Sequence, residues 1–447
     1  MARPAPLSGF PEWLPGDRIV EQQVLDRLRR TFESWGFASI QTRAVEPLEE
    51  MLRKGEIDKE VYVLRRLHAA PDEDDASRGL GLHFDLTVPF ARYVLENSGK
   101  LAFPFKRYQI QPVWRGERPQ EGRYREFWQA DVDVVGVGEL PFHHDVEVAQ
   151  VMAEALGGLP LPPITLQLNN RKLIQGFYTG VGAPDVPAVM RAIDKIDKLR
   201  PDAVRELLVT DARLTATQAD LCLRLAAIQA QDARFAEQVA ALGVSDPLLD
   251  QGLHELVQVV EGVAALRAPG FSAVADLRIA RGLDYYTGTV YETRMAGYEH
   301  LGSICSGGRY DSLASDGATT YPGVGISFGV TRTLGPLFSR GALRASRSVP
   351  TCVLVALASE EQRPAAALVA AALRRRGICA EVAPAADKFG KQIRYADRRG
   401  IPFVWFPGAD EGQDEVKDIR SGGQVPADPS AWLPPPEDLV PQVLGAS

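Results

Sequence analysis

The sequence lacks the features that mark several classes of protein. Its 447 residues include only four cysteines, which lie far apart without Cys-x-x-Cys spacing, so neither a disulfide framework nor a zinc site is expected. No stretch approaches the roughly 20 apolar residues of a membrane-spanning helix, and the N-terminus has no apolar signal-peptide run. The net charge of −8 argues against general coating of nucleic acid. We therefore expect a cytoplasmic protein with reduced thiols and no membrane contact.

What remains is the composition of an ordinary globular protein. Hydrophobic residues make up 45% and charged residues 24%, and the length predicts two or three domains. Apolar positions at helical spacing predict a helix over 17–35, whereas 37–45 and 81–89 have the character of strands. The polar stretch 68–81 predicts an exposed loop.

The pattern of secondary structure changes along the chain. Mixed strands and helices, including a helix near 142–157, give way to an Ala- and Leu-rich stretch with repeated helical periodicity, which predicts a helical insertion. Strand signals then return, a linker composition follows, and the last part alternates strands and helices, which predicts a small, mostly parallel α/β domain. The expected segments are 1–170, 171–267, 268–337, 338–349 and 350–447.

Residues 108–136 form the most informative stretch and predict two strands around a turn that holds Gly116, Pro119 and Gly122. Side chains in a strand alternate between its two faces. One face then carries arginines and an aromatic ring at one end, with an amide and two carboxylates at the other: Arg123, Arg125, Phe127, Gln129, Asp131 and Asp133. This face could bind a phosphorylated planar ligand beside a small cationic or amphoteric one. A solvated hairpin with surface ion pairs is the plainer alternative. The other face is mostly apolar and fits a core: Tyr124, Glu126, Trp128, Ala130, Val132 and Val134.

Three further segments are candidates for function. In 281–288 (RGLDYYTG) consecutive tyrosines face opposite ways, so at least one could belong to the core. In 323–332 (GVGISFGVTR) a glycine-packed strand runs into a helix with Arg332 on its first turn, and the spacing is not the dinucleotide fingerprint. Residues 305–310 (CSGGRY) predict a glycine-rich turn. The histidines show no metal-ligand spacing, so we interpret them as structural and expect no metal site: His83, His143 and His144.

The sequences of these segments and their order along the chain resemble one family, the histidyl-tRNA synthetases of class II. Residues 114–136 (WRGERPQEGRYREFWQADVDVVG) look like the second class-defining motif, and 281–292 (RGLDYYTGTVYE) looks like the segment peculiar to histidine enzymes. The segments HFDLTVPFARY, CSGGRYD and GISFGVTR match in order, and the likeness runs from 14 to 423. It implies an α+β fold: a class II catalytic domain on an antiparallel sheet, interrupted by the helical insertion and followed by an anticodon-binding α/β domain. It also implies a homodimer.

The resemblance implies a two-step reaction, in which histidine attacks ATP to give histidyl-adenylate and tRNA(His) then takes the histidyl group. ATP is a substrate that enters with Mg²⁺, and no zinc is expected. The catalytic residues would be Arg115, on the α-phosphate, and Arg281, acting from the opposite side. Glu117 would orient adenine near Phe127. The terminal phosphates would be held by Arg123 and Arg332.

The resemblance also assigns the histidine pocket. The α-amino group would be held at Asp85, Thr87 and Gln129. The imidazole nitrogens would be read by Asp133 and Tyr286, with Tyr285 completing the wall. Three further residues would also contact the histidine: Leu86, Arg115 and Arg281. This assignment leaves Asp131, on the same face, without a role.

Contacts with tRNA are expected from two places. Gln120 in the hairpin turn would approach the acceptor end, and four basic residues share one face of a helix in the last domain: Lys388, Lys391, Arg394 and Arg398. The chain departs from the family at Arg43, where proline is usual, and at Thr331, where glutamate is usual.

Two other readings stay open at this point. One is a catalytically silent synthetase paralogue that binds histidine and controls the first enzyme of histidine biosynthesis. Such paralogues generally lack the anticodon-binding domain and degrade the arginine set, both of which this chain keeps. The other is an RNA-binding protein without chemistry, which would not need the polar set formed by Gln129, Asp133 and Tyr286.

Overall fold

The computed structural model describes residues 5–52, 60–67, 79–279, 286–315, 317–410 and 412–445. The chain divides into two compact units. The first comprises Met1–Pro11 and Leu25–Pro336, and the second comprises Glu12–Val24 and Leu337–Ser447. Helix α1 (Pro15–Ser34) contributes to both, and its apolar positions Val24, Leu28 and Phe32 are buried.

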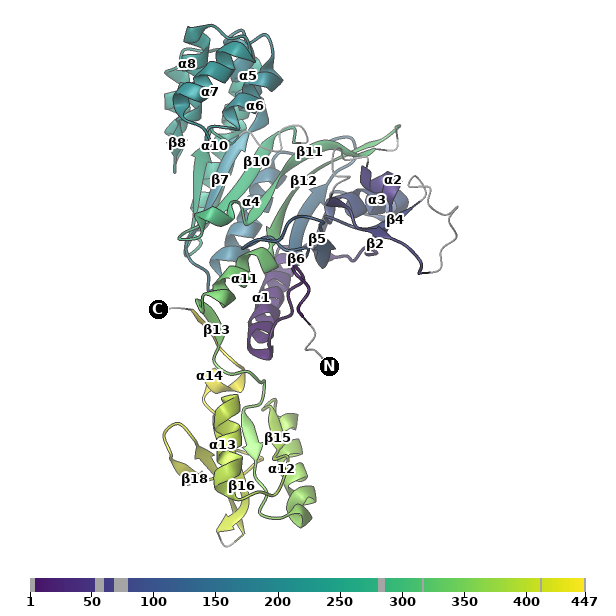
Figure 1. Cartoon of the computed structure of the whole chain (residues 1–447), viewed down its shortest axis with the longest axis vertical. Helices are drawn as coiled ribbons and strands as arrows, with labels where there is room; N and C mark the ends of the chain where they lie inside the picture. The colour runs from purple at the N-terminus through teal and green to yellow at the C-terminus, as the bar shows by residue number, and fades with distance from the viewer. Residues whose placement is uncertain are drawn as a thin grey trace. The chain divides into compact units, whose positions relative to one another are not determined.

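A large mixed sheet forms the centre of the first unit (Figure 1). Its strand order is β1-β5-β6-β12-β11-β10-β7-β9-β8. The pairs β1–β5 and β7–β9 are parallel and the other pairs are antiparallel, which confirms the α+β class. The strands are β1 (Ala38–Ser39), β5 (Phe105–Trp114), β6 (Glu126–Val135), β7 (Ile164–Asn170), β8 (Gln229–Ala230), β9 (Phe271–Asp276), β10 (Thr289–Met295), β11 (Cys305–Ser315) and β12 (Thr320–Gly329).

Helices cover both sides of this sheet. Helix α4 (His143–Gly157) packs on β6, β9 and β12 through a face that includes Val148, Val151 and Met152. Helix α3 (Thr87–Asn97) packs against β11 on the opposite side, where its Phe90 lies over Arg107 and beside Val135. Burial of such side chains contributes roughly 1.5–3 kcal/mol each, so the two helices hold the sheet between them.

The segment between β7 and β9 is mostly helical, and Figure 1 shows its helices gathered beyond the β7 side of the sheet. Side-chain caps start several of them: Asn170 caps α5, Asp185 caps α6, and Thr215 with Gln218 forms a capping box on α8. The short strand β8 in this segment joins the edge of the main sheet. The helices are α5 (Arg171–Gly180), α6 (Val186–Ile193), α7 (Pro201–Thr210), α8 (Ala216–Ala226), α9 (Phe235–Ala240) and α10 (Pro247–Leu266).

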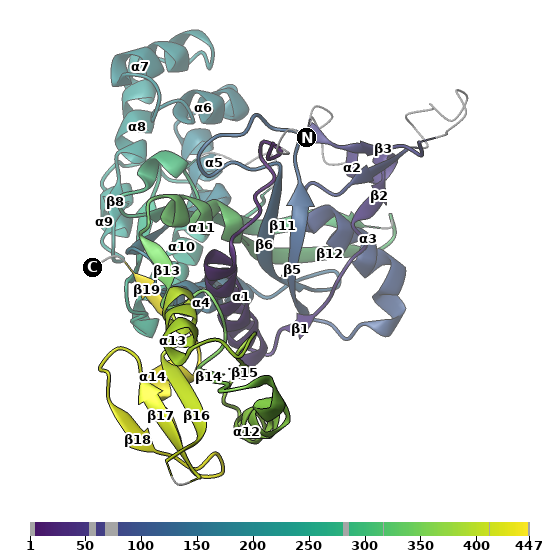
Figure 2. The same ribbon diagram turned by 60° about the horizontal axis from the view of Figure 1, so that its bottom comes forward.

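Two strands expected from the sequence are much shorter in the structure. The stretch 37–45 contains β1 and the first residue of β2 (Val45–Pro47) but is not one strand. Its backbone turns instead to side chains, since the Thr42 N–H donates to Gln111 Oε1 at 3.0 Å. Likewise 81–89 holds the end of β4 (Leu80–Leu82) and then the start of α3, because Asp85 caps the Val88 N–H at 3.0 Å. A small sheet of order β2-β4-β3, with β3 at Val63–Leu64, lies beside α2 (Leu48–Leu52) (Figure 2).

The expected turn at 305–310 is wrong, because these residues begin the central strand β11. Their glycines serve close packing and not a turn. A Cβ on Gly307 would lie 2.0 Å from the Gly325 carbonyl oxygen, and one on Gly308 would lie 2.6 Å from the Tyr286 ring. Glycine inside a strand often marks such close approach. The expected loop at 68–81 lies outside the described residues except for 79–81, of which Leu80 and Gly81 belong to β4.

The second unit contains a five-stranded sheet of order β15-β14-β16-β17-β18. Strands β14 (Val353–Val355), β15 (Ala380–Val382) and β16 (Phe403–Asp410) are parallel as expected. Strands β17 (Gln413–Asp418) and β18 (Gln424–Pro426) add antiparallel pairs that the alternating pattern did not predict. Its helices are α12 (Arg363–Arg375), α13 (Phe389–Arg399) and α14 (Pro436–Leu439). Within 338–349, β13 (Leu343–Ala345) pairs with β19 (Val443–Gly445).

Candidate active site

A polar cleft opens on the face of the main sheet formed by β5, β6, β12 and β11. The volume of this cleft is about 200 Å³. A smaller recess of about 50 Å³ adjoins it and shares part of its lining, including Thr87, Asp131 and Tyr286. The cleft brings together residues that are far apart in the sequence and that the sequence analysis selected: Asp85, Thr87, Arg115, Glu117, Arg123, Phe127, Gln129, Tyr286 and Arg332.

Three cross-strand rows build the floor of the site. Strand β6 lies between β5 and β12, so Gln129, Asp131 and Asp133 each lie opposite one residue on either side. Because directly opposite residues lie about 4.5–5.5 Å apart, the side chains within one row are close enough to interact. The rows are Arg107–Asp133–Gly325, Gln109–Asp131–Ser327 and Gln111–Gln129–Gly329.

Arginines converge at one end of the cleft. The Arg115 guanidinium donates to the Phe84 carbonyl oxygen at 3.0 Å and lies 5.2 Å from the centre of the Phe127 ring. Glu117 lies 3.8 Å from Arg115 and 3.5 Å from Arg123. With Arg332, which also lines this end, the site has three cations beside one carboxylate and is suited to a polyanion.

Arg332 completes the cationic end. It lies in the first turn of α11 (Val330–Ser339), as expected from the sequence, and its Nη2 donates to the Leu301 carbonyl oxygen. Its Nε is buried and donates to no described group. Burial, and then the neighbouring Arg123 and Arg115, lower its pKa. These features indicate that the Arg332 guanidinium is positioned to bind an anion.

The recess at the other end is built around Asp133. Its Oδ2 lies 2.7 Å from Nη2 of the fully buried Arg107, an ion pair outside hydrogen-bond geometry, and its Oδ1 accepts from the Tyr310 hydroxyl at 2.7 Å. A Cβ on Gly325 would lie 2.0 Å from the same Oδ1, so only glycine fits there. Burial, followed by the charge of Asp133, raises the pKa of Tyr286. The recess therefore offers a fixed carboxylate and a neutral phenol.

Gln129 and Asp131 lie between the two ends. Gln129 Nε2 donates to the Ser327 hydroxyl at 3.0 Å. Gln129 Oε1 and Asp131 Oδ1 are buried and accept no hydrogen bond from any described group. A buried acceptor without a donor costs about 1–3 kcal/mol, so this position is suited to a ligand that donates.

Some expected residues lie elsewhere. Arg125 does not share the face of Phe127. It precedes β6, packs against Gly9 and donates to the Glu117 carbonyl oxygen at 3.2 Å. Tyr124, expected in the core, lines the cleft instead. Both differences follow from the strand beginning at Glu126, so the alternation cannot be extended back to 123–125.

Other expected residues are placed without a direct contribution to the cleft lining. The Leu86 side chain is fully buried, so any contact with a ligand would come from its backbone. Gln120 is exposed in the hairpin turn, where it pairs with Arg123 as an isolated bridge. Arg281 and Tyr285 lie outside the described residues.

The sequence analysis missed several residues of the site. Arg107 and Tyr310 flank Asp133, while Ser303, Ser306 and Ser327 line the cleft. Ser327 lies in a segment predicted as a strand, so counting alternate positions along it would have found this residue. Ser306 and Tyr310 were hidden because 305–310 was predicted to be a turn and not the start of β11. Arg107 gave no such signal, because a fully buried arginine is rare and its partner is a residue of the next strand.

The two departures from the family have distinct local roles. Thr331 Oγ1 accepts from the Trp128 N–H at 2.8 Å and joins α11 to β6. Arg43 is half exposed and pairs at 3.0 Å with the buried Glu46, which Arg92 also binds. Neither residue lines the cleft.

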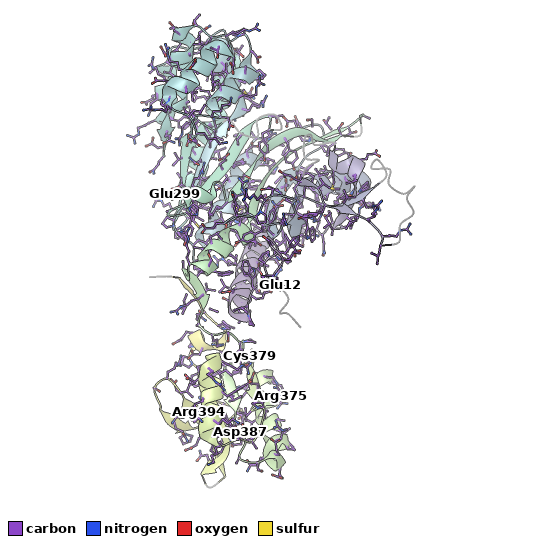
Figure 3. All side chains as sticks on the ribbon, in the orientation of Figure 1. Glu12, Glu299, Arg375, Cys379, Asp387 and Arg394 are labelled. Atoms are coloured by element: carbon purple, nitrogen blue, oxygen red, sulfur yellow. The ribbon has the colours of Figure 1, made fainter. Side chains whose placement is uncertain are left out.

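The four basic residues of the second unit are arranged as expected. Lys388 precedes α13, and Lys391, Arg394 and Arg398 are exposed along it while Gln392 and Ala396 face the core. Figure 3 labels Arg394 and the neighbouring Asp387, and the latter pairs with Lys391 at 2.9 Å. The helix thus presents a local basic face.

Two of the three histidines that we interpreted as structural have polar partners in the protein, and the third, His143, packs against the His144 ring. His83 Nε2 lies 2.9 Å from the Pro112 carbonyl oxygen, and burial lowers its pKa. His144 Nδ1 lies 2.9 Å from Glu147. Within the described ranges, no three His, Cys, Asp or Glu side chains are grouped to hold a metal ion, and no helix has the length and apolarity to cross a membrane.

Comparison with known proteins gives the same result for both parts of the chain. Residues 9–333 match the family model described as histidyl-tRNA synthetase, and residues 351–428 match the anticodon-binding domain. The chain is 60% identical to the histidine–tRNA ligase of Cutibacterium acnes and 59% identical to that of Micrococcus luteus, with complete coverage of each pair. A crystal structure of histidyl-tRNA synthetase from Nostoc sp. PCC 7120 superposes with a TM-score of 0.84 at 34% identity, covering 96% of this chain and 97% of that one.

Proposed function

Because this chain belongs to the histidyl-tRNA synthetase family, we propose that it activates L-histidine with ATP and transfers the histidyl group to the 3′-end of tRNA(His). The observation that carries the proposal is the division of one cleft into a cationic end and a carboxylate–phenol recess. ATP requires the first and an imidazole requires the second. The two ends meet on a single strand, β6, where the reacting groups would meet as well.

At the cationic end, the protein would act by position and charge. Arg115 is fixed by its bond to the Phe84 carbonyl, so its remaining donors can point at the α-phosphate, where negative charge grows during attack. Phe127 offers a face for the adenine ring, and Glu117 offers an acceptor for its amino group. Arg123 and Arg332 would hold the outer phosphates, together with Mg²⁺ that enters on them.

At the recess, imidazole would be read by its donor and its acceptor. Asp133 accepts, and its position is fixed by Arg107 and Tyr310; Tyr286 is neutral and can donate. A ligand lacking either nitrogen would leave a buried polar group unpaired, which discriminates strongly against isosteres. The histidine carboxylate would then point toward Arg115, and its amino group toward Asp85, Thr87 and Gln129.

Several parts of the proposal rest on the family alone. Arg281 would act on the α-phosphate from the side opposite Arg115, and Tyr285 would close the histidine pocket. Gln120 would approach the acceptor end of the tRNA, and the basic face of α13 would meet its anticodon region. A homodimer in the cytoplasm is the expected assembly. The domain limits expected from the sequence are 170, 267, 337 and 349.

Histidine-dependent exchange of labelled pyrophosphate into ATP tests the proposal directly. We expect exchange with wild-type protein, and its near-complete loss in Arg115→Ala and Arg281→Ala with histidine binding largely retained in the latter. Arg205→Ala, an exposed change in the insertion whose ion pair with Asp220 is at the surface, should leave the rate unchanged. Folded wild-type protein that binds histidine but shows no exchange with Mg²⁺ present would favour the regulatory paralogue instead.

A further inference from the structure

Asp131 is the most deeply placed charge of the cleft without an assigned task. Its residue is 2% exposed, yet it lines both the cleft and the recess. Its Oδ1 accepts no hydrogen bond from the described residues. A buried carboxylate oxygen without a donor is unfavourable in the empty protein, so a ligand that donates there would relieve the cost.

The position of Asp131 identifies which part of a ligand it would meet. It occupies the middle cross-strand row, with the Asp133 row on the recess side and the Gln129 row on the side of the arginines. If the recess binds the imidazole ring and the arginine end binds the phosphates, the middle row faces the part of histidine between its ring and its carboxylate. This part contains the α-carbon, which carries the ammonium group.

The surrounding groups favour a cation over an anion at this point. Asp85 lines the same cleft, and its negative charge adds a small contribution to the raised pKa of Asp131, after burial and the charge of Asp133. Gln129 Oε1, the next side chain along the same face, is a second buried acceptor that receives no hydrogen bond from the described residues. An ammonium group has three N–H donors and a positive charge, which match two or three converging acceptors and their excess negative charge.

We propose that Asp131 binds the α-ammonium group of histidine, as a second carboxylate beside Asp85 and Gln129. The inference deepens the proposed function and rests on it. Asp131 would then select for α-amino acids, while Asp133 and Tyr286 select for the imidazole. The carboxylate of the substrate is left to face the arginines.

Titration of Asp131 supplies an independent readout. Burial raises its pKa to about 7, Arg107 opposes this, Asp133 adds to it, Ser327 opposes it by a hydrogen bond, and Asp85 adds to it. The other titratable groups that interact with it are Tyr286 and Cys305, both buried and neutral because burial raises their pKa. The carboxyl is therefore about half protonated near pH 7. An ammonium ligand would stabilise the ionised form and release the proton.

Calorimetric binding of three ligands to wild type and Asp131→Asn tests the proposal. Histidine and histidinol carry the amino group, whereas imidazolepropionate lacks it. We expect Asp131→Asn to raise the Kd for histidine and for histidinol by about 10- to 100-fold, the range for a hydrogen bond to a charged group. The Kd for imidazolepropionate should stay within about twofold of the wild-type value. Equal weakening of all three ligands would mean a structural role or an imidazole contact and would overturn the proposal, as would no weakening of any.

Proton release on binding can be compared between the wild type and Asp131→Asn with a single ligand, so that the titration of the ligand's own imidazole cancels. Histidinol binding at pH 7, in buffers with different ionisation enthalpies, should release about half a proton more from the wild type than from Asp131→Asn, since Asp131 titrates at about 7. Equal release from both proteins would overturn the assignment. Wild-type protein that binds neither histidine nor histidinol would overturn the proposed function itself, whereas normal wild-type binding that Asp131→Asn does not alter would overturn only this inference.

Discussion

Replacing Arg107 by methionine should both destabilise the first unit and weaken histidine binding. Arg107 is fully buried, its Nη2 lies 2.7 Å from Asp133, and its guanidinium lies 4.2 Å from the centre of the Phe90 ring. Methionine keeps most of the volume and the contact with the ring but removes the charge. The carboxylate of Asp133 would remain buried beside Tyr310 without its cation.

The size of the effect follows from the burial of the pair. At an effective dielectric constant of about 20, two unit charges at this separation attract by about 6 kcal/mol, but desolvation offsets part of this attraction. Breaking a buried pair by removing one partner costs about 3–5 kcal/mol in net stability. For a unit of roughly 320 residues, with an unfolding entropy of about 2.1 cal/mol/K per residue, the melting temperature should fall by about 4–7 °C.

Differential scanning calorimetry measures the stability, and the KM for histidine in pyrophosphate exchange measures the site. The KM for histidine should rise at least about tenfold, because Asp133 loses its fixed position, whereas the KM for ATP should change little. Arg205→Met, which breaks the exposed pair with Asp220, is the matched control and should alter neither property. If Arg107→Met melted like the wild type and kept its KM for histidine, the reasoning about the recess would be refuted.

Three further predictions concern neighbouring positions. Gly325→Ala places a Cβ 2.0 Å from Asp133 Oδ1 and should raise the KM for histidine more than that for ATP, whereas Gly99→Ala, with open space around it, should be neutral in the same exchange assay. Thr331→Val leaves a buried backbone N–H of β6 without its acceptor and should cost about 1–3 kcal/mol in denaturant unfolding; an unchanged midpoint would contradict this. Without ligand, Asp131→Asn should be more stable than the wild type, and the gain should be larger at pH 8 than at pH 5.5. The folded-state pKa of about 7 lies above the ordinary aspartate value of 3.8, so wild-type stability falls as pH rises between these values and stays low above them. Thermal unfolding at the two pH values checks the sign.

Patterns of residues predicted which side chains share a polar face better than they predicted where the strands begin and end. The period-two alternation of β6 correctly placed Phe127, Gln129, Asp131 and Asp133 on one polar face, because a strand fixes that alternation once its limits are known. It failed at Arg125 and Tyr124, which precede the strand. Strand limits depend on which backbone groups find partners, and no local pattern shows that the Arg125 N–H bonds to the Gly9 carbonyl oxygen at 2.7 Å.

Glycine was the residue type most open to misreading. The pair at 307–308 predicted a turn, since glycine is common where the chain reverses, but the structure uses it where neighbouring strands and the Tyr286 ring leave no room for a side chain. The signals for the helical insertion are local and were therefore easier to interpret. Its helical periodicity lies within the segment itself, and the side chains that cap its helices are close to them in the sequence: Asn170, Asp185 and Asp246.

The three cross-strand rows tie the chemistry of the cleft to the alignment of β5, β6 and β12. Inserting or deleting one residue in any of these strands would send every later side chain of that strand to the opposite face. In β6, Asp131 and Asp133 would then change places with valines of the core, so the pocket and the fold would be lost in the same event. The hairpin turn at 115–125 is not bound by this alternation, but it carries Arg115, Glu117 and Arg123 of the cleft. Within the three strands, the pocket can therefore change by substitution but not by a change of length.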